Sequence, residues 1–338
     1  MDSSVIVDSS FLSHTVRFSL YNSPYTAHDR GSAIDLYPGT LADGRTTVAP
    51  SPVSGTVLET RSVRAPAKPY APEHDHLILL SCDGPPSVAG LVARILHVDP
   101  DVEPGEYVDA GDSLGTLVRA GFFAPWVDNH LHVGFRKPDQ NHHRASGSLE
   151  LSLDIDVTPL EWDGTGTVVE TGETYAVLDQ PVHPAPETGF VGIAATRRGE
   201  TPMAGEEAKA GETPTAEKTG KAREETMVGV LDGGLPHYEG GGFLECERSA
   251  ERNVGHPPSI PASDTVSLLG TDLGSVTGRT ITWDDVTVTV DGTPITGLSC
   301  FCARDGGFGA KLICPDHHLE RGAMVHVGID THAHQKRI

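Results

Sequence analysis

Short runs of β-branched residues, separated by turn-forming pairs, recur along most of this chain. The run Val286–Val290 alternates valine with threonine and is followed at once by Asp291-Gly292. The 338 residues include 38 glycines and 25 prolines, which supply many further turns, whereas long stretches with the 3.6-residue apolar period of an amphipathic helix are nearly absent. The sequence therefore predicts a mostly β protein.

The predicted organisation has four parts, since the length allows more than one domain. Strand-like runs dominate residues 1–158 and 227–338, which we expect to form two β domains. Residues 159–195 hold a shorter β stretch, expected to be an insertion between them. Residues 196–226 consist mainly of Ala, Gly, Glu, Thr, Pro and Lys without apolar periodicity, which predicts a disordered linker or loop.

The charge of the chain excludes several kinds of partner. A formal net charge of -22 repels phosphate backbones and anionic lipids, so neither nucleic acid nor a membrane surface is expected to bind. An acidic, lysine-poor surface also suits a cytosol of high ionic strength, as in a halophile. The first ten residues lack the positive charge of a secretory signal, no apolar run reaches the length of a membrane span, and five cysteines fit a reducing compartment. We therefore expect a cytoplasmic protein.

Two short motifs contain residue types that bind metals. His28 and Asp35 are separated by a turn that contains Gly31, and an apolar strand follows. His130 and His132 lie two apart in a strand-like run, so their side chains should share one face. Two imidazoles and one carboxylate suit zinc in an open catalytic site that keeps a fourth position for water.

These motifs resemble those of the zinc peptidase superfamily that unites lysostaphin-type endopeptidases, D-alanyl-D-alanine peptidases and hedgehog domains. The segment His28-x-x-Gly31-x-Ala33-x-Asp35 looks like the first zinc motif of the D-alanyl-D-alanine branch. The lysostaphin branch usually has its histidine four residues before the aspartate, where this chain has Gly31. His130-Leu131-His132 is like the closing His-x-His motif of the lysostaphin branch.

Two further stretches resemble the lysostaphin branch. The residues from Val48-Ala49-Pro50 to Gly55-Thr56-Val57 are similar to its strand after the aspartate. Residues 103–115, with glycines at 105, 111 and 115, are similar to its glycine-punctuated hairpin. The resemblance covers residues 5–144, less than half of the chain, and implies a lysostaphin-like domain with a barrel-sandwich hybrid core, followed by a C-terminal β domain.

The resemblance also implies roles for individual residues. His28, Asp35 and His132 would be the ligands of a Zn²⁺ ion, and His97 and His130 would be the catalytic, non-ligand histidines near the bound water. Zinc lowers the pKa of such a water to about 7, while a nearby neutral histidine accepts a proton and later returns it to the leaving amine. The expected function is that of a zinc-dependent, metallopeptidase-like hydrolase of peptide or amide bonds in a small substrate.

Two other functions remain open. Lysostaphin-branch enzymes mostly cut peptidoglycan outside the membrane, and this chain shows no export signal, so a catalytically inactive, metal-holding binding module is the first alternative. The second is a phosphocarrier-like domain, because Val325–Thr331, which contains His326, looks like the phosphorylated-histidine strand of glucose-type phosphocarriers. A biotinyl or lipoyl carrier is excluded, since no lysine occurs between Lys68 and Lys137 for the cofactor.

Two C-terminal features each allow two interpretations. The side chains of Cys300, Cys302, Cys314 and His317 could form a structural Cys₃His zinc site, or the thiols could be buried core residues. Residues 232–242 contain five glycines but no lysine in the place that a phosphate-binding loop requires. They form either a turn-rich loop or a loop over the zinc cleft, with His237, Tyr238 or Glu239 touching substrate.

Overall fold

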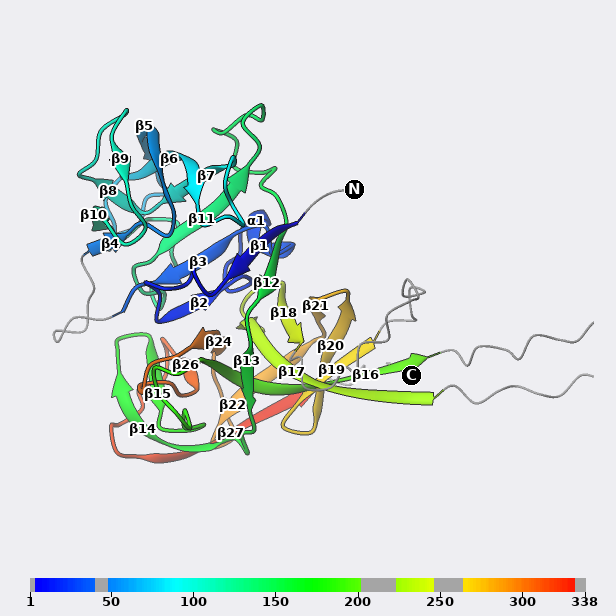
Figure 1. The fold of residues 1–338 in the computed structure, drawn as a ribbon. Helices are drawn as coiled ribbons and strands as arrows, with labels where there is room; N and C mark the ends of the chain where they lie inside the picture. Colours follow the sequence, from blue (N-terminus) through cyan, green and yellow to red (C-terminus); the bar gives the residue numbers. More distant parts are fainter. Residues whose placement is uncertain (1–3, 40–47, 202–222, 246–263, 332–338) are drawn as a thin grey trace, which may run out of the picture.

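The computed structural model describes residues 4–39, 48–201, 223–245 and 264–331. Strands account for 52% of the chain and helix for 1%, which confirms the predicted mostly β fold. Figure 1 shows two bodies, an upper one of blue to cyan-green strands and a lower one of green to red strands. Within the described residues, no helix is long and apolar enough to span a membrane.

The N-terminal domain is a sandwich of two antiparallel sheets. The larger has the order β9–β5–β6–β7–β11–β3–β2, and the smaller has the order β4–β10–β8. A parallel pair, β1 with β12, closes one side. The bounds are β1 Val5–Asp8, β2 Arg17–Ser19, α1 Thr26–Asp29, β3 Ile34–Tyr37, β4 Val48–Pro50, β5 Ser54–Arg64, β6 His74–Gly84, β7 Val92–Leu96, β8 Val98–Pro100, β9 Tyr107–Val108, β10 Ser113–Leu117, β11 Leu131–Arg136 and β12 Leu151–Asp154.

The alternation along β11 decides which side chains face the candidate site. Leu131, Val133 and Phe135 enter the core of the sandwich, where they are at most 1% exposed. His132 lies on the opposite face, because successive side chains of a strand point to opposite sides. Packing of these three side chains in the N-terminal core therefore fixes the position of β11, and His132 lies on the other face of that strand.

The C-terminal domain is built around a closed antiparallel barrel of six strands. Its strands pair in the order β16–β17–β18–β21–β20–β19 and back to β16. The remaining strands extend this barrel on one side. The bounds are β13 Val157–Leu160, β14 Thr165–Thr171, β15 Tyr175–Leu178, β16 Phe190–Thr201, β17 Arg223–Leu235, β18 Gly240–Glu245, β19 Asp264–Leu268, β20 Thr271–Thr277, β21 Thr280–Trp283, β22 Val286–Val290, β23 Thr293–Pro294, β24 Gly297–Cys300, β25 Cys302–Ala303, β26 Lys311–Ile313 and β27 Met324–Thr331.

The structure differs from two of the predicted boundaries. Residues 159–195 are not a separate insertion, because β14 and β15 pair with β27 and β26 and share their hydrophobic core. The predicted disordered segment 196–226 begins and ends in strands, since β16 runs to Thr201 and β17 starts at Arg223. Its centre, residues 202–222, lies outside the described residues.

The polar composition at the start of that segment has a structural reason. Arg197 pairs with Asp264 at 2.6 Å, and Arg198 pairs with Asp272. These arginines lie on the rim of the barrel, where neighbouring strands carry the opposite charge. The end of a strand that is stabilised by ion pairs with neighbouring strands lacks the alternating apolar residues by which a strand is recognised in a sequence.

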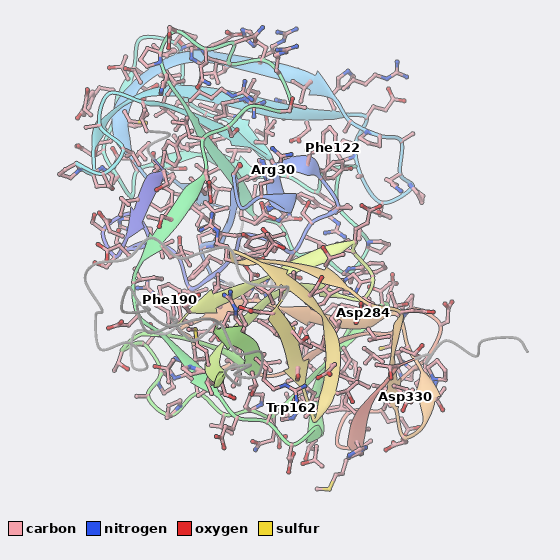
Figure 2. The ribbon with its side chains drawn as sticks, turned by 90° about the vertical axis from the view of Figure 1, so that its right-hand side faces the viewer. Arg30, Phe122, Trp162, Phe190, Asp284 and Asp330 are labelled. Carbon is pink, nitrogen blue, oxygen red and sulfur yellow. The ribbon has the colours of Figure 1, made fainter. Side chains whose placement is uncertain are left out.

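The two domains are joined by continuous hydrogen bonding. β2 of the N-terminal domain pairs with β25, and β25 pairs with β16 of the barrel. The N-terminal core also takes in Phe190, Val230 and Cys302 from the other domain. Figure 2 shows the same arrangement from the side, with Arg30 and Phe122 in the upper body and Trp162 in the lower one. The strands that carry the candidate site therefore lie beside the domain junction.

Candidate metal centre

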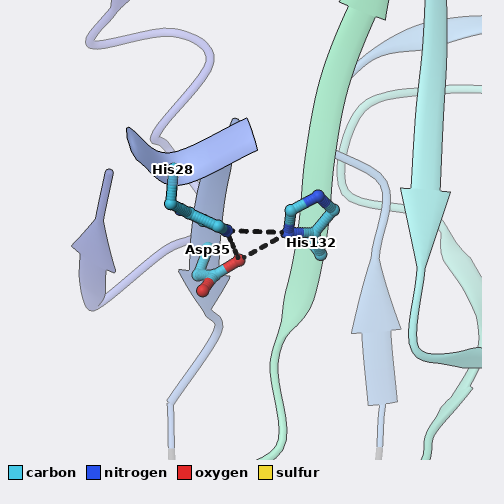
Figure 3. A group of neighbouring side chains, drawn as sticks. All are labelled: His28, Asp35 and His132. Atoms are coloured by element: carbon cyan, nitrogen blue, oxygen red, sulfur yellow. Dashed lines mark hydrogen bonds and ion pairs between the residues drawn. The ribbon is translucent and has the colours of Figure 1, made fainter. Parts of the chain in front are cut away.

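The structure brings together the three residues that were predicted as metal ligands. His28 lies on α1, Asp35 on β3 and His132 on β11 (Figure 3). His28 Nε2 is 3.0 Å from His132 Nδ1 and 3.3 Å from Asp35 Oδ1, and His132 Nδ1 is 2.9 Å from Asp35 Oδ1. In the described part of the chain, this is the single group of three or more His, Cys, Asp or Glu side chains that could hold a metal ion.

Local geometry explains the convergence. The antiparallel register of β3 and β11 sets Asp35 directly opposite His132. His28 lies in the single helical turn of α1, and Gly31, with φ of +58°, lets the chain reverse into β3. A side chain at Gly31 would also collide with the Tyr21 hydroxyl, which would lie 2.9 Å from its Cβ.

The three atoms are arranged as zinc ligands require. In a tetrahedral site with metal–ligand bonds of about 2.0–2.1 Å, neighbouring ligand atoms lie about 3.3–3.4 Å apart. The separations here, 2.9 to 3.3 Å, are close to that value. His28 Nδ1 donates to the Leu20 carbonyl oxygen at 2.7 Å, so Nε2 is the nitrogen that faces Asp35 and His132. The residues present therefore fit a zinc ion.

The electrostatics favour the protonation states that a metal needs at Asp35 and His132, but not at His28. Burial lowers the pKa of His28, but the charge of Asp35 and hydrogen bonds to Asp35 and Leu20 more than offset this, so that its pKa is raised. Burial raises the pKa of Asp35, but the neighbouring His130 and His28 more than offset this, so that its pKa lies well below the usual range. Burial lowers the pKa of His132 to about 4 despite its bond to Asp35. At neutral pH the carboxyl is therefore ionised and the His132 imidazole is neutral, as metal binding requires.

Both predicted non-ligand histidines lie beside the three ligands. His130 Nε2 is 3.4 Å from Asp35 Oδ1, and its Nδ1 donates to the Asp128 carbonyl oxygen at 2.9 Å. The ring of His97 lies 5.2 Å from that of His130 and 5.8 Å from that of His132, between ring centres. The structure thus places all five predicted site residues in one cluster.

Asp75 is part of this cluster and was missed by the sequence analysis. Its carboxylate, which is 0% exposed, accepts a hydrogen bond from His97 Nδ1 at 2.6 Å. Burial lowers the pKa of His97, although Asp75 acts in the opposite direction. A polar residue two positions before the apolar run Leu77–Leu80 was the available signal, but its partner depends on the pairing of β6 with β7.

Aromatic side chains enclose the site. Phe123 stacks on the His130 ring with 4.4 Å between ring centres. The ring centre of Tyr37 lies 5.0 Å from that of His130. His28, Asp35, His97 and His130 are each at most 5% exposed. The centre is therefore buried.

The glycine-rich segment 232–242 lies against the loop that carries Phe123. The ring centres of His237 and Trp126 lie 5.5 Å apart. Tyr238 is buried, with 9% of its surface exposed, whereas Glu239 is exposed. Burial lowers the pKa of His237 to about 4 and raises that of Tyr238 to about 12. The segment thus packs on the loop that precedes His130, and whether its residues touch a substrate stays a prediction.

The alternative site residues do not gather in the same way. Cys300 belongs to the C-terminal core and Cys302 to the N-terminal core, and Cys314 is also buried, so these thiols are core residues. They form no metal-binding group with His317 in the described structure. His326 is exposed on β27, opposite Thr165.

Fold and site together define a two-domain, all-β protein with a buried His₂Asp centre at the domain junction. A family model described as the Domain of unknown function (DUF8155) N-terminal domain matches residues 6–153, and the DUF8155 C-terminal domain matches residues 158–330. The chain therefore belongs to the DUF8155 family. The two matches meet between β12 and β13, where the structure also divides. No curated protein matches this sequence.

Proposed function

We propose that this protein is a zinc-dependent, metallopeptidase-like hydrolase of peptide or amide bonds. One observation carries the proposal: His28, Asp35 and His132, from three separate elements, present ligand atoms 2.9 to 3.3 Å apart, with two further histidines beside them. The residue order and types match those of the zinc peptidases that the sequence resembles. The substrate class, a small peptide or amide, comes from that resemblance.

The roles of the residues follow from their hydrogen bonds. His28 Nε2, Asp35 Oδ1 and His132 Nδ1 would hold the zinc, which when bound supplies a water of lowered pKa and a polarised carbonyl. His130 donates from Nδ1 to the Asp128 carbonyl, so its Nε2 keeps a lone pair directed toward the site. His97 is held in the same way by Asp75. Either imidazole can accept a proton and return it to the leaving amine.

The setting of this activity is proposed to be a cytoplasm of high salt. Cys82, Cys300 and Cys314 are free thiols, and all three are buried, which suits a reducing compartment. The net charge of -22 favours neither nucleic acid nor a membrane as a partner. Assays in molar salt are therefore the appropriate starting point.

A second candidate function is a metal-holding module without catalysis. The burial of the centre favours it, because His28 and Asp35 are only 1% and 2% exposed and Phe123 covers His130. A substrate reaches such a site only if the surrounding loop moves.

A peptide-library screen separates the two candidates. Wild type, His130→Ala and metal-stripped protein are incubated side by side at high salt, and cleavage is read by mass spectrometry. The hydrolase predicts cleavage by the wild type, none by the metal-stripped protein, and at most residual cleavage by His130→Ala, in which His97 remains and zinc is still bound. Zinc bound without any cleavage would favour the binding module, and cleavage by the metal-stripped sample would refute a zinc-dependent reaction.

A further inference from the structure

A carboxylate of the C-terminal domain reaches into the segment that leads to the metal centre. Asp232, on β17, is 0% exposed. Its Oδ1 accepts a hydrogen bond from the Ser19 hydroxyl at 2.5 Å, and its Oδ2 accepts from the backbone N–H groups of Leu20 and Tyr21 at 2.6 and 3.3 Å. Its hydrogen bonds therefore join β17 to the end of β2, across the domain junction.

The peptide group between Leu20 and Tyr21 links this carboxylate to His28. Its N–H, on Tyr21, donates to Asp232, while its carbonyl oxygen, on Leu20, accepts from His28 Nδ1 at 2.7 Å. Metal-binding histidines commonly donate their second ring N–H to a carbonyl or carboxylate, which fixes the tautomer and the ring orientation. Hydrogen bonds in such a chain polarise one another, so an ionised Asp232 strengthens the carbonyl as an acceptor.

We propose that Asp232 is a positioning residue of the metal centre, and that through the Leu20–Tyr21 peptide it fixes the tautomer and orientation of His28. The inference rests on the proposed zinc site. It assigns to the C-terminal domain a part in that site, although all three ligands belong to the N-terminal domain.

The glycines around Asp232 make this contact possible. Gly233 has φ of +134°, and a Cβ there would lie 2.9 Å from the Gly241 Cα. A Cβ on Gly242 would lie 2.2 Å from the ring of Tyr21. Larger residues at these positions would push β17 away from β18 and displace the Tyr21 ring. The glycine-rich segment thus permits a close approach between backbones.

The state of Asp232 suits this role at neutral pH. Burial raises its pKa to about 6, and the bonds from Ser19 and the Leu20 backbone limit the rise. The carboxylate is therefore ionised at pH 7.5. His28 is one of the groups whose charge favours that ionised form.

The affinity for zinc of the full-length protein tests the inference. Asp232→Asn, measured by chelator competition at pH 7.5, is expected to weaken zinc binding about 10- to 100-fold, the usual effect of losing support behind a ligand. Asp264→Asn is the matched control, because Asp264 is a carboxylate of the same domain, 7% exposed, that pairs with Arg197. It should bind zinc within twofold of wild type. An Asp232→Asn protein with wild-type affinity overturns the inference.

Nuclear magnetic resonance of the His28 ring gives a readout that general destabilisation does not move. In zinc-loaded wild type, Nδ1 should carry the proton and Nε2 the metal, and Asp232→Asn should shift the Nδ1–H resonance while Asp264→Asn leaves it in place. A zinc-loaded wild type with the proton on Nε2 overturns the inference even if the Asp232 variant fails to fold. A wild type that retains no zinc overturns the proposed function as well.

Discussion

Removal of the Asp128 carboxylate should destabilise the junction between the domains. Asp128 lies 2.5 Å from Arg17 of its own domain and 3.0 Å from Lys311 of the C-terminal domain. The Lys311 side chain is 6% exposed and has no other carboxylate within 4.0 Å among the described residues. Asp128→Asn therefore leaves two cations side by side, one of them buried.

The expected magnitude follows from the burial of the pair. Breaking a fully buried ion pair by removing one partner costs about 3–5 kcal/mol. The Asp128 side chain is 42% exposed, so water screens part of the charge, and we expect a loss of about 2 kcal/mol in the free energy of unfolding. For a domain of this size, that lowers the melting temperature by about 4–8 °C.

Urea unfolding of single and double variants measures this coupling. Lys311→Met in the Asp128→Asn background should recover part of the loss, because it removes the unpaired ammonium. Lys311 and Arg17 outweigh the effect of burial and lower the pKa of Asp128, so the stabilisation is present above the unfolded-state pKa of about 3.9 and is lost as the pH falls below it. Equal stability of wild type and Asp128→Asn at pH 7 would refute this reasoning, as would a difference that persists undiminished at pH 2.

Three further predictions concern the centre and the cores. Saturating zinc, at about 100 times its dissociation constant, should stabilise the wild type by about 2.7 kcal/mol and raise its melting temperature, whereas calorimetry of Asp35→Asn should show no such increase. Cys302→Ala should lower the free energy of unfolding by about 1–2 kcal/mol and leave the zinc content unchanged, since this thiol lies in the N-terminal core; a loss of zinc measured by elemental analysis would contradict that placement. His130→Ala should keep its zinc in equilibrium dialysis, because its ring lies beside the three ligands and is not one of them, and loss of the metal would make His130 a ligand.

The parts of the fold and site that sequence could predict are those set by local patterns. Turn-forming pairs between β-branched runs predicted the mostly β fold. The predicted strand carries His132, but it begins at Leu131, so His130 lies just before it. Asp232 could not be found in this way, since its bonds to Leu20 and Tyr21 join residues more than 200 positions apart. The closed barrel was missed for the same reason, because strands of residues 190–201 and 264–268 pair only in three dimensions.

The boundary errors have a related physical cause. The polar residues Arg197 and Arg198 at the start of the predicted linker favoured a disordered segment. In the structure both form ion pairs with carboxylates on neighbouring strands. Asp75 was missed because a buried carboxylate is identified by its partner, and His97 lies 22 residues away, between β7 and β8. The composition of a segment indicates whether it can bury apolar surface. It does not indicate whether its charged residues form ion pairs with neighbouring strands.

Elemental analysis of the purified, full-length protein tests the central claim most directly. Wild type, His28→Ala, Asp35→Ala and His132→Ala are compared with His143→Ala, whose side chain is 45% exposed and lies outside the cluster. We predict close to one zinc per chain in wild type and His143→Ala, and a large loss in the other three. Equal, substoichiometric metal in all five proteins would contradict the metal centre.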